Sequence, residues 1–260
     1  MSNGSLRIER DGPLGYVVLD NQARRNAISA AMWRALPSAI AELGADPTVR
    51  CIVLRGAGEV AFAAGADISE FENNRASDDA VRSYEAATAA AHHALENTLK
   101  PVIAQIQGFC IGGGLALALS CDLRYCADDS QFAIPAARLG LGYGVHGHRR
   151  LVATVGHAAA REIMFSARRY DAAAARELGL VNRVLPVAEL DVYVRALAAD
   201  LAANAPLTQA ASKAAINATL AEHGDFKQCE ALIARCMRSA DYREGRTAFM
   251  EKRQPKFEGR

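Results

Sequence analysis

The sequence has almost no excess of charge of either sign, and this limits the partners that it can bind. Its 30 lysine and arginine residues are balanced by 29 aspartate and glutamate residues, for a formal net charge of +1. Proteins that bind nucleic acids or anionic membranes through bulk charge are strongly basic. We therefore expect no nucleic-acid partner and no membrane partner. Only local basic clusters could hold a phosphate group.

Cysteine pairs with the spacing of a metal site are absent as well. The six cysteines include no C-x-x-C pair, and zinc sites commonly use such pairs. We expect reduced thiols, no bound metal and a cytoplasmic location. Residues 1–15 contain no apolar run, so no signal peptide is expected.

One uncharged run, residues 101–121, is long enough to cross a membrane. It contains Gln105, Gln107 and the triplet Gly112-Gly113-Gly114, which suit a continuous lipid-facing helix poorly. We interpret it as a buried strand, a glycine turn and a buried helix, and we expect no membrane span.

What the sequence does contain is ample material for a folded core. The chain has 260 residues, of which 51% are hydrophobic and 23% charged, as in ordinary folded proteins. Strand and helix patterns alternate, which indicates an α/β fold with parallel strands. Expected strands are 16–20, 51–55, 102–106, 123–126, 132–134 and 181–185. Expected helices are 29–43 (capped by Ser29 and disturbed by Pro37), 78–99, 115–120, 145–155, 157–166, 171–178 and much of 190–250.

Two glycine-bearing loops, residues 61–68 and 108–114, each follow a predicted strand. Glycine permits positive φ and a close approach of two backbones, and the start of a helix presents unpaired N–H groups to an anion. One N–H group from each loop would make an oxyanion hole for a thioester enolate. The same spacing also fits two tight turns that bind no ligand.

Several segments in a fixed order cover nearly the whole chain. They are residues 19–28 (with Arg24-Arg25-Asn26-Ala27), 62–68, 100–104, 108, 112–114, 171–186, 243–245 and 248–253. In this order they resemble the crotonase superfamily, the enoyl-CoA hydratase/isomerase family. The resemblance implies a crotonase-like spiral of ββα units over residues 1–200 and a C-terminal helical trimerisation region over 201–260. It also implies a homotrimer or a hexamer built as a dimer of trimers.

The resemblance further implies a CoA thioester substrate of the kind found in fatty acid metabolism, with no bound cofactor, because coenzyme A is part of the substrate. The thioester carbonyl would lie between the N–H groups of Ala66 and Gly113. The two arginines could equally be solvated charges, and Asp67 could cap a helix. The implied CoA-binding residues are Arg24, Arg25, Ala27, Ala64, Asp67 and Ile68, with Phe249 and Lys252 from a neighbouring subunit.

The sequence departs from the family at the acid/base positions. Hydratases of the family carry glutamates where this chain has Ala116 and Ala136, and isomerases carry a carboxylate at the position of Gly144. Positioned acid–base groups contribute on the order of 10²–10⁴-fold to a rate. Efficient hydration by two glutamates is therefore not expected.

The loop 140–150 supplies other candidates. Tyr143 aligns with a tyrosine that methylmalonyl-CoA decarboxylases place near the substrate carboxylate, although those enzymes carry a histidine at the position of Ala66. His146 would lie in the first turn of a helix, where a neutral imidazole is favoured and can act as a base. His92 and His93 are interpreted as surface residues.

We therefore predict a hydratase-like lyase that uses Tyr143 and His146. One alternative is a malonyl-type CoA decarboxylase that uses Tyr143, and another is an acyl-CoA binding protein without catalysis. A dinucleotide site at the G-x-G-x-x-G pattern of 142–147 is disfavoured, because residues 135–139 make a poor strand. The acyl chain length depends on residues 71–97, whose shape the sequence does not give.

Overall fold

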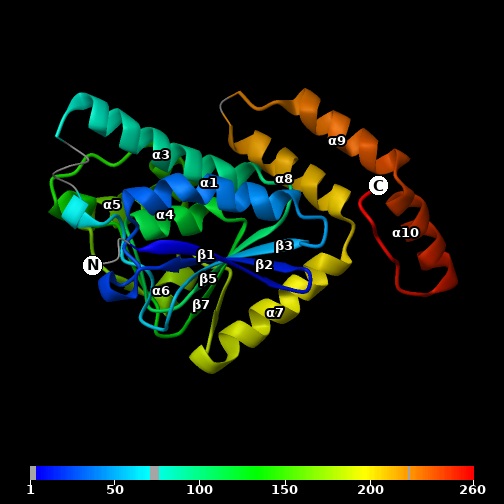
Figure 1. The fold of residues 1–260 in the computed structure, drawn as a ribbon, viewed down its shortest axis with the longest axis horizontal. Helices are drawn as coiled ribbons and strands as arrows, with labels where there is room; N and C mark the ends of the chain where they lie inside the picture. Colours follow the sequence, from blue (N-terminus) through cyan, green and yellow to red (C-terminus); the bar gives the residue numbers. More distant parts are fainter. Residues whose placement is uncertain (1–3, 71–75, 222) are drawn as a thin grey trace.

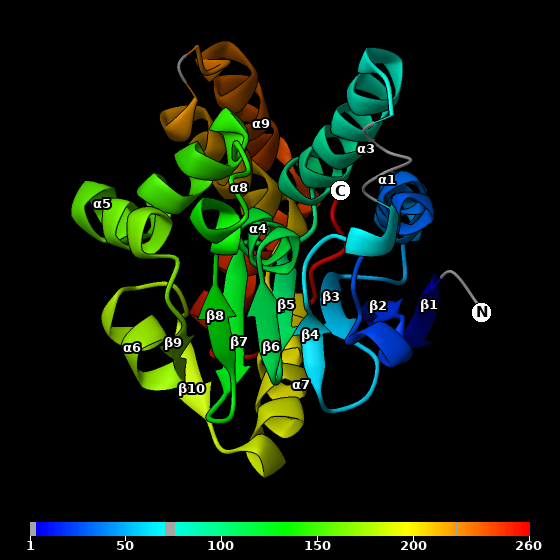
Figure 2. The same ribbon diagram turned by 90° about the vertical axis from the view of Figure 1, so that its left-hand side faces the viewer.

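The computed structural model describes residues 4–70, 76–221 and 223–260. Two sheets form its centre (Figures 1 and 2). In spatial order, the larger sheet contains β1 (Ser5–Asp11), β2 (Leu14–Asp20), β3 (Cys51–Gly56), β5 (Val102–Ile106), β7 (Leu123–Ala127) and β10 (Arg183–Leu185). The smaller sheet contains β4 (Ala61–Ala63), β6 (Phe109–Ile111), β8 (Gln131–Ala133) and β9 (Tyr170–Asp171). Neighbouring strands are parallel except in the pairs β1–β2 and β8–β9.

The chain passes through the two sheets in a repeated order. It forms β3, β4 and α3 (Asp78–Asn97), then β5, β6 and α4 (Gly113–Ser120), then β7, β8 and α5 (Val145–Ser166). The first strand of each unit joins the larger sheet and the second joins the smaller one. This confirms the α/β class and the spiral of ββα units.

Local signals set the helix ends. The hydroxyl oxygen of Ser29 accepts from the Met32 N–H at 3.3 Å and caps α1 (Ala30–Ala45), which runs through Pro37 as one helix. Residues 145–155 and 157–166 are separated at Gly156, whose φ of 75° and ψ of 171° break α5. Asp171 caps α6 (Ala172–Glu177) by accepting from the Ala174 N–H at 2.8 Å.

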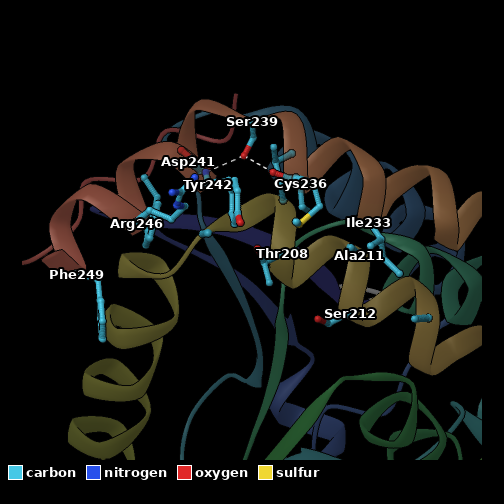
Figure 3. A pocket seen from close by; sticks show the side chains of 16 residues that line it. Thr208, Ala211, Ser212, Ile233, Cys236, Ser239, Asp241, Tyr242, Arg246 and Phe249 are labelled. Carbon is cyan, nitrogen blue, oxygen red and sulfur yellow. Dashed lines mark hydrogen bonds between the residues drawn. The ribbon is translucent and has the colours of Figure 1, made fainter.

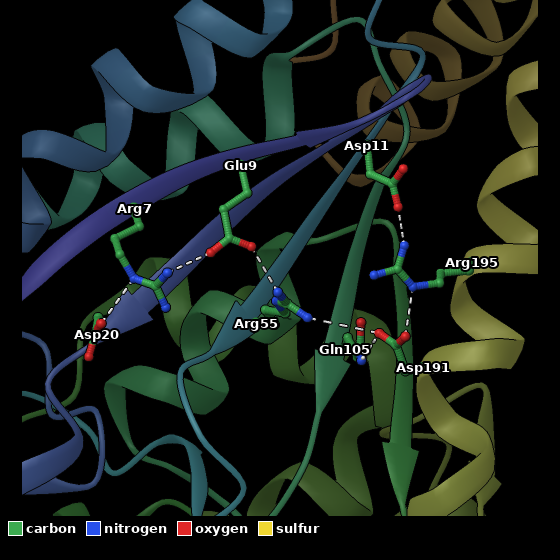
Figure 4. Close-up of polar contacts among 8 residues, drawn as sticks. All are labelled: Arg7, Glu9, Asp11, Asp20, Arg55, Gln105, Asp191 and Arg195. Atoms are coloured by element: carbon green, nitrogen blue, oxygen red, sulfur yellow. Dashed lines mark hydrogen bonds and ion pairs between the residues drawn. The ribbon is translucent and has the colours of Figure 1, made fainter.

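Four helices end the chain: α7 (Val187–Ala203), α8 (Pro206–Leu220), α9 (Phe226–Arg238) and α10 (Ala240–Glu251). α7 packs on the larger sheet through Leu190, Val194 and Ala198. Arg195 of α7 also forms an ion pair with Asp11 of β1, and Asp191 of α7 pairs with Arg55 of β3 (Figure 4). α8, α9 and α10 extend beyond the sheets (Figure 1). The expected boundary at residue 200 falls in the last turn of α7.

The sequence analysis missed four strands, the shortest of which is the two-residue β9. β4 and β6 lie in segments that were expected to be loops, and each has only three residues, too few to show an alternating pattern. β1 is an edge strand with a largely exposed, polar sequence. The last strand is also shorter than expected, because it begins at Arg183.

The uncharged run 101–121 is divided among β5, β6 and α4. Its residues are largely buried in the cores on the two faces of the larger sheet. Among the helices of the described residues, none combines the length and the apolar character that a membrane span requires.

Candidate active site

The two glycine-bearing loops meet where β4 and β6 pair in parallel. Gly65 has a φ of 107°, which residues with a side chain rarely adopt. A β-carbon on Gly114 would collide with the carbonyl oxygen of Ala63, so glycine allows α4 to approach β4. A β-carbon on Gly113 would lie 3.4 Å from the nitrogen of Ala66. The backbones of Ala66 and Gly113 are therefore in contact range.

In the part of the chain that the structure describes, the N–H groups of Ala66 and Gly113 have no hydrogen-bond acceptor. The adjacent N–H groups are occupied: Asp67 donates to the Ile28 carbonyl at 3.0 Å and Gly112 donates to the Ala133 carbonyl at 2.8 Å. Both free donors belong to half-buried residues. Two neighbouring unpaired donors can stabilise a developing oxyanion.

The predicted CoA-binding residues of segments 24–28 and 64–68 lie beside these two donors, and we call the surface that they form the rim. The Ala64 N–H donates to the Arg25 carbonyl at 3.0 Å, and the Ile28 N–H donates to the Gly65 carbonyl at 2.8 Å. Segments 24–28 and 64–68 therefore run side by side. Arg24, Arg25 and Ile68 are exposed on the rim, whereas Ala27 is buried and Ala64 is half-buried. The guanidinium of Arg25 lies 5.0 Å from the centre of the Phe109 ring.

Asp67 is buried and has partners within the chain. One carboxylate oxygen accepts from the Ser69 hydroxyl at 2.7 Å and the other accepts from Arg24 at 2.5 Å. Burial opposes ionisation, but these hydrogen bonds outweigh it and lower the pKa of Asp67. The Ser69 N–H also donates to Asp67 at 3.1 Å. Asp67 therefore caps the short 3-10 helix Ile68–Glu70 and pairs with Arg24.

Phe249 and Lys252 lie far from this rim. Both belong to the end of α10, on the opposite side of the molecule from the start of α4 (Figure 1). Phe249 is 82% exposed. It borders an apolar cavity of about 680 Å³ between α8, α9 and α10 (Figure 3). One copy of the chain does not bring them to Ala66 and Gly113.

The predicted acid/base positions carry no acid or base. Ala116 lies in the first turn of α4 and is 9% exposed, and Ala136 lies in the 3-10 helix Pro135–Arg138 and is 4% exposed. Gly144 is the N-cap residue of α5. Because Ala116, Ala136 and Gly144 have no group that donates or accepts a proton, any proton transfer must use other side chains.

Tyr143 is partly buried in the loop before α5, and its ring lies edge-on to the His148 ring at 5.4 Å. The hydroxyl is buried and has no hydrogen-bond partner among the described residues. Burial raises the pKa of this hydroxyl well above its ordinary value. It is therefore a neutral donor without an acceptor among the described residues.

His146 lies in the first turn of α5, as expected, but it is engaged by a residue that the sequence analysis did not single out. Its Nε2 lies 3.0 Å from Oε1 of Glu96 on α3. Glu96 is 7% exposed, and its other oxygen lies 2.5 Å from Arg150. The carboxylate therefore links His146 and Arg150, which lie one turn apart on α5.

The interpretation of His92 as a surface residue is wrong. The side chain is partly buried, with Nδ1 2.9 Å from the Ser120 hydroxyl oxygen. Its ring centre is 5.5 Å from that of Trp33 and 5.7 Å from that of His146. Burial and, second, the nearby His146 lower the pKa of His92 to about 4.

A sequence signal for this cluster did exist. His92 and Glu96 are four residues apart, and so are His146 and Arg150. This spacing places each pair on one face of its helix. What the sequence could not show is that the two faces meet.

The sequence pattern of the enoyl-CoA hydratase/isomerase family matches residues 9–260. The chain is 33% identical to a short-chain-enoyl-CoA hydratase from Clostridium acetobutylicum, over 100% of this chain and 98% of that protein. It is 31% identical to a crotonyl-CoA hydratase from Syntrophomonas wolfei, over 99% of each chain.

A crystal structure of an enoyl-CoA hydratase/isomerase family protein from Hyphomonas neptunium is similar in fold. It superposes with a TM-score of 0.93 at 38% identity and covers 98% of both chains. The sequence pattern, the curated relatives and the superposition all span nearly the full length. The chain therefore belongs to the enoyl-CoA hydratase/isomerase family of the crotonase superfamily.

Proposed function

We propose that this chain is a hydratase-like lyase that acts on an acyl-CoA thioester through an enolate. The N–H groups of Ala66 and Gly113 would bind the thioester oxygen as negative charge develops on it. The observation that carries the proposal is that these two donors are adjacent, have no acceptor among the described residues and belong to half-buried residues. Each donor of an oxyanion hole is worth roughly 3 kcal/mol of transition-state stabilisation.

The coenzyme A part of the substrate would lie along the rim formed by segments 24–28 and 64–68. Arg24 and Arg25 are exposed there and can contact phosphate groups. Phe249 and Lys252 would come from a neighbouring subunit of a homotrimer or hexamer. Within one chain, α10 lies on the opposite side of the molecule from the start of α4 (Figure 1), so these residues would reach the rim only from another copy. The proposed reaction needs no other cofactor, and we propose a cytoplasmic location.

The acid/base chemistry would differ from that of the two-glutamate hydratases, because Ala116 and Ala136 cannot transfer protons. Tyr143 and His146 are the predicted replacements. The unpaired Tyr143 hydroxyl also favours the first alternative, decarboxylation of a malonyl-type CoA, since it could hold a carboxylate. The two alanines favour the second alternative, binding of acyl-CoA without turnover.

The test compares Gly113→Pro with Gly113→Ala in crotonyl-CoA hydration, followed as loss of the enoyl absorbance at high enzyme concentration. Proline removes the N–H group and is tolerated at the first residue of a helix. Alanine keeps the N–H group but adds the β-carbon, which would lie 3.3 Å from Cζ2 of Trp33.

We expect Gly113→Pro to lower turnover on the order of 10²–10³-fold relative to Gly113→Ala. Equal turnover of the two variants would refute the proposed oxyanion hole. Tight binding of acyl-CoA, with no turnover of crotonyl-CoA or malonyl-CoA by the wild-type protein, would establish the binding-protein alternative instead.

A further inference from the structure

The cluster around His92 joins four helices next to the proposed oxyanion hole. Trp33 comes from α1, His92 and Glu96 from α3, Ser120 from α4, and His146 with Arg150 from α5. Trp33 connects the two places: its Cζ2 would lie 3.3 Å from a β-carbon on Gly113, and its ring centre lies 5.5 Å from that of His92. The indole ring of Trp33 therefore lies next to both the imidazole of His92 and the backbone of Gly113.

Ser120 holds one ring nitrogen of His92, since Nδ1 lies 2.9 Å from its hydroxyl oxygen. The same hydroxyl lies 3.3 Å from the Ala116 carbonyl oxygen, to which it can donate. When it does, its oxygen accepts from Nδ1 and the lone pair of the neutral ring lies on Nε2. Within residues 4–70, 76–221 and 223–260, Nε2 has no hydrogen-bond partner. This atom is free to take a proton.

Ala116 lies on the face of α4 that meets His92. Ala116 and Ser120 are one turn apart and lie on the same face of α4. His92 bonds to Ser120 on that face. The position at which hydratases of the family carry a glutamate therefore lies on the face of α4 that His92 contacts.

The indole N–H group of Trp33 is a second feature that points to a ligand. Trp33 is 2% exposed, and its Nε1 has no partner among the described residues. Buried indole N–H groups usually have an acceptor. A bound thioester that extends from Gly113 toward His92 would pass along this ring.

We propose that His92 is a further proton-transferring residue of this site, beside the predicted Tyr143 and His146, and that Ser120 is its positioning residue. This inference rests on the proposed function. Nε2 of His92 removes a proton from the α-carbon of the acyl-CoA. The electron pair of that C–H bond moves into the bond between the α-carbon and the carbonyl carbon. The carbonyl oxygen takes the negative charge next to the two N–H donors, and return of the proton from Nε2 restores the thioester.

Burial, together with the nearby positive charges, keeps this base neutral. The groups that face His92 are His146 and Arg150 from α5 and Glu96 from its own helix, while Ser120 and Trp33 contribute no charge. Burial, His146 and Arg150 oppose a proton on His92, and Glu96 favours one. The Glu96 carboxylate is already paired with His146 and Arg150, so the effects that lower the pKa of His92 prevail.

The experiment measures exchange of the α-hydrogens of butyryl-CoA for deuterium in D₂O, by mass spectrometry. The proteins are the wild type, His92→Gln, Ser120→Ala, Gly113→Pro and the matched control His93→Gln, since His93 is the exposed neighbour. Calorimetric titration with butyryl-CoA gives the affinity of each protein.

We expect His92→Gln to slow exchange on the order of 10²-fold or more with unchanged affinity, and His93→Gln to behave as the wild type. Ser120→Ala should slow exchange less than His92→Gln. The wild-type rate should be flat at neutral pH and fall in acid with a midpoint near the pKa of His92, about 4.

One outcome would separate the two proposals: His92→Gln exchanges the α-hydrogens as fast as the wild type, whereas Gly113→Pro does not. The role of His92 would then be wrong, and the oxyanion hole would still be supported. If no protein exchanges, both proposals fail. Because a variant could fold poorly, ¹⁵N NMR of the wild type adds an independent check. At pH 6 the hydrogen of His92 must be on Nδ1, and a hydrogen on Nε2 would overturn the assignment.

Discussion

Glu96 and His146 are 50 residues apart in the sequence, and their side chains meet at 3.0 Å between Oε1 and Nε2. The carboxylate is almost completely buried and also holds Arg150. A buried charge needs compensation, so this contact fixes how α3 packs against α5. The same packing places His92 beside His146.

Glu96→Gln should destabilise the protein. The substitution keeps the size of the side chain but leaves Arg150, which is 19% exposed, without its countercharge. Removal of one partner of a buried pair costs about 3 kcal/mol. The measurement is the urea midpoint at pH 7.5. Glu162→Gln is the control, because the Glu162–Arg168 pair is exposed and should contribute about 0–1 kcal/mol. Equal midpoints for the two variants would contradict the prediction.

The stability of the folded protein should depend on pH through His92. Its pKa is about 4 in the folded state and 6.5 as the ordinary value. Between these values the unfolded chain binds more protons, so the contribution of His92 is present above pH 6.5 and is lost as pH falls to 4. The total loss is roughly 3 kcal/mol.

This dependence is measured by urea unfolding of the wild type and His92→Gln at pH 7.5 and 4.5. The stability advantage of the wild type over the variant should shrink at the lower pH. His93→Gln should follow the wild type at both values. An advantage that does not change with pH would show that His92 titrates normally.

Ala116→Glu with Ala136→Glu should increase hydratase activity. The two methyl groups are buried near the start of α4 and before α5, and carboxylates there would supply the missing acid and base. We expect hydration of crotonyl-CoA to rise on the order of 10²-fold or more over the wild type. Each single variant serves as a control and should gain less. Efficient hydration by the wild type itself would show that the alanines are no obstacle.

Tyr143→Phe should slightly stabilise the ligand-free protein, because it removes a buried hydroxyl without a partner. The gain should be about 1 kcal/mol, measured as a shift of the urea midpoint. The same variant tests the decarboxylase alternative. If Tyr143 holds a substrate carboxylate, the wild type releases CO₂ from malonyl-CoA and the variant does not. A destabilised Tyr143→Phe would mean that the hydroxyl has a structural partner.

The local part of the fold could be predicted from the sequence. Ser29, Gly156 and Asp171 set helix ends through their own backbone preferences and hydrogen bonds. The contact between the two glycine loops was expected from the family resemblance. β4 and β6 could not be recognised, because strands of three residues are stabilised by pairing within the smaller sheet and not by a pattern of their own.

The environment of His92 could not be predicted for a related reason. Its neighbours Trp33, Ser120 and His146 come from three other helices. Burial of a polar side chain in an alanine-rich helix depends on what packs against that helix, and the spacing within the helix does not report this. His146 was placed correctly in the first turn of α5, but Glu96 was not foreseen as its partner.

The ladder of hydrogen bonds between segments 24–28 and 64–67 has a consequence for how substrates are discriminated. The segment proposed to bind the nucleotide end of the substrate also sets the position of Ala66. The affinity for the substrate and the activation of its carbonyl therefore depend on the same pair of segments. Energy gained from the remote end of a substrate can then be used at its reacting carbonyl. Thioesters truncated to pantetheine should for this reason lose kcat as well as affinity.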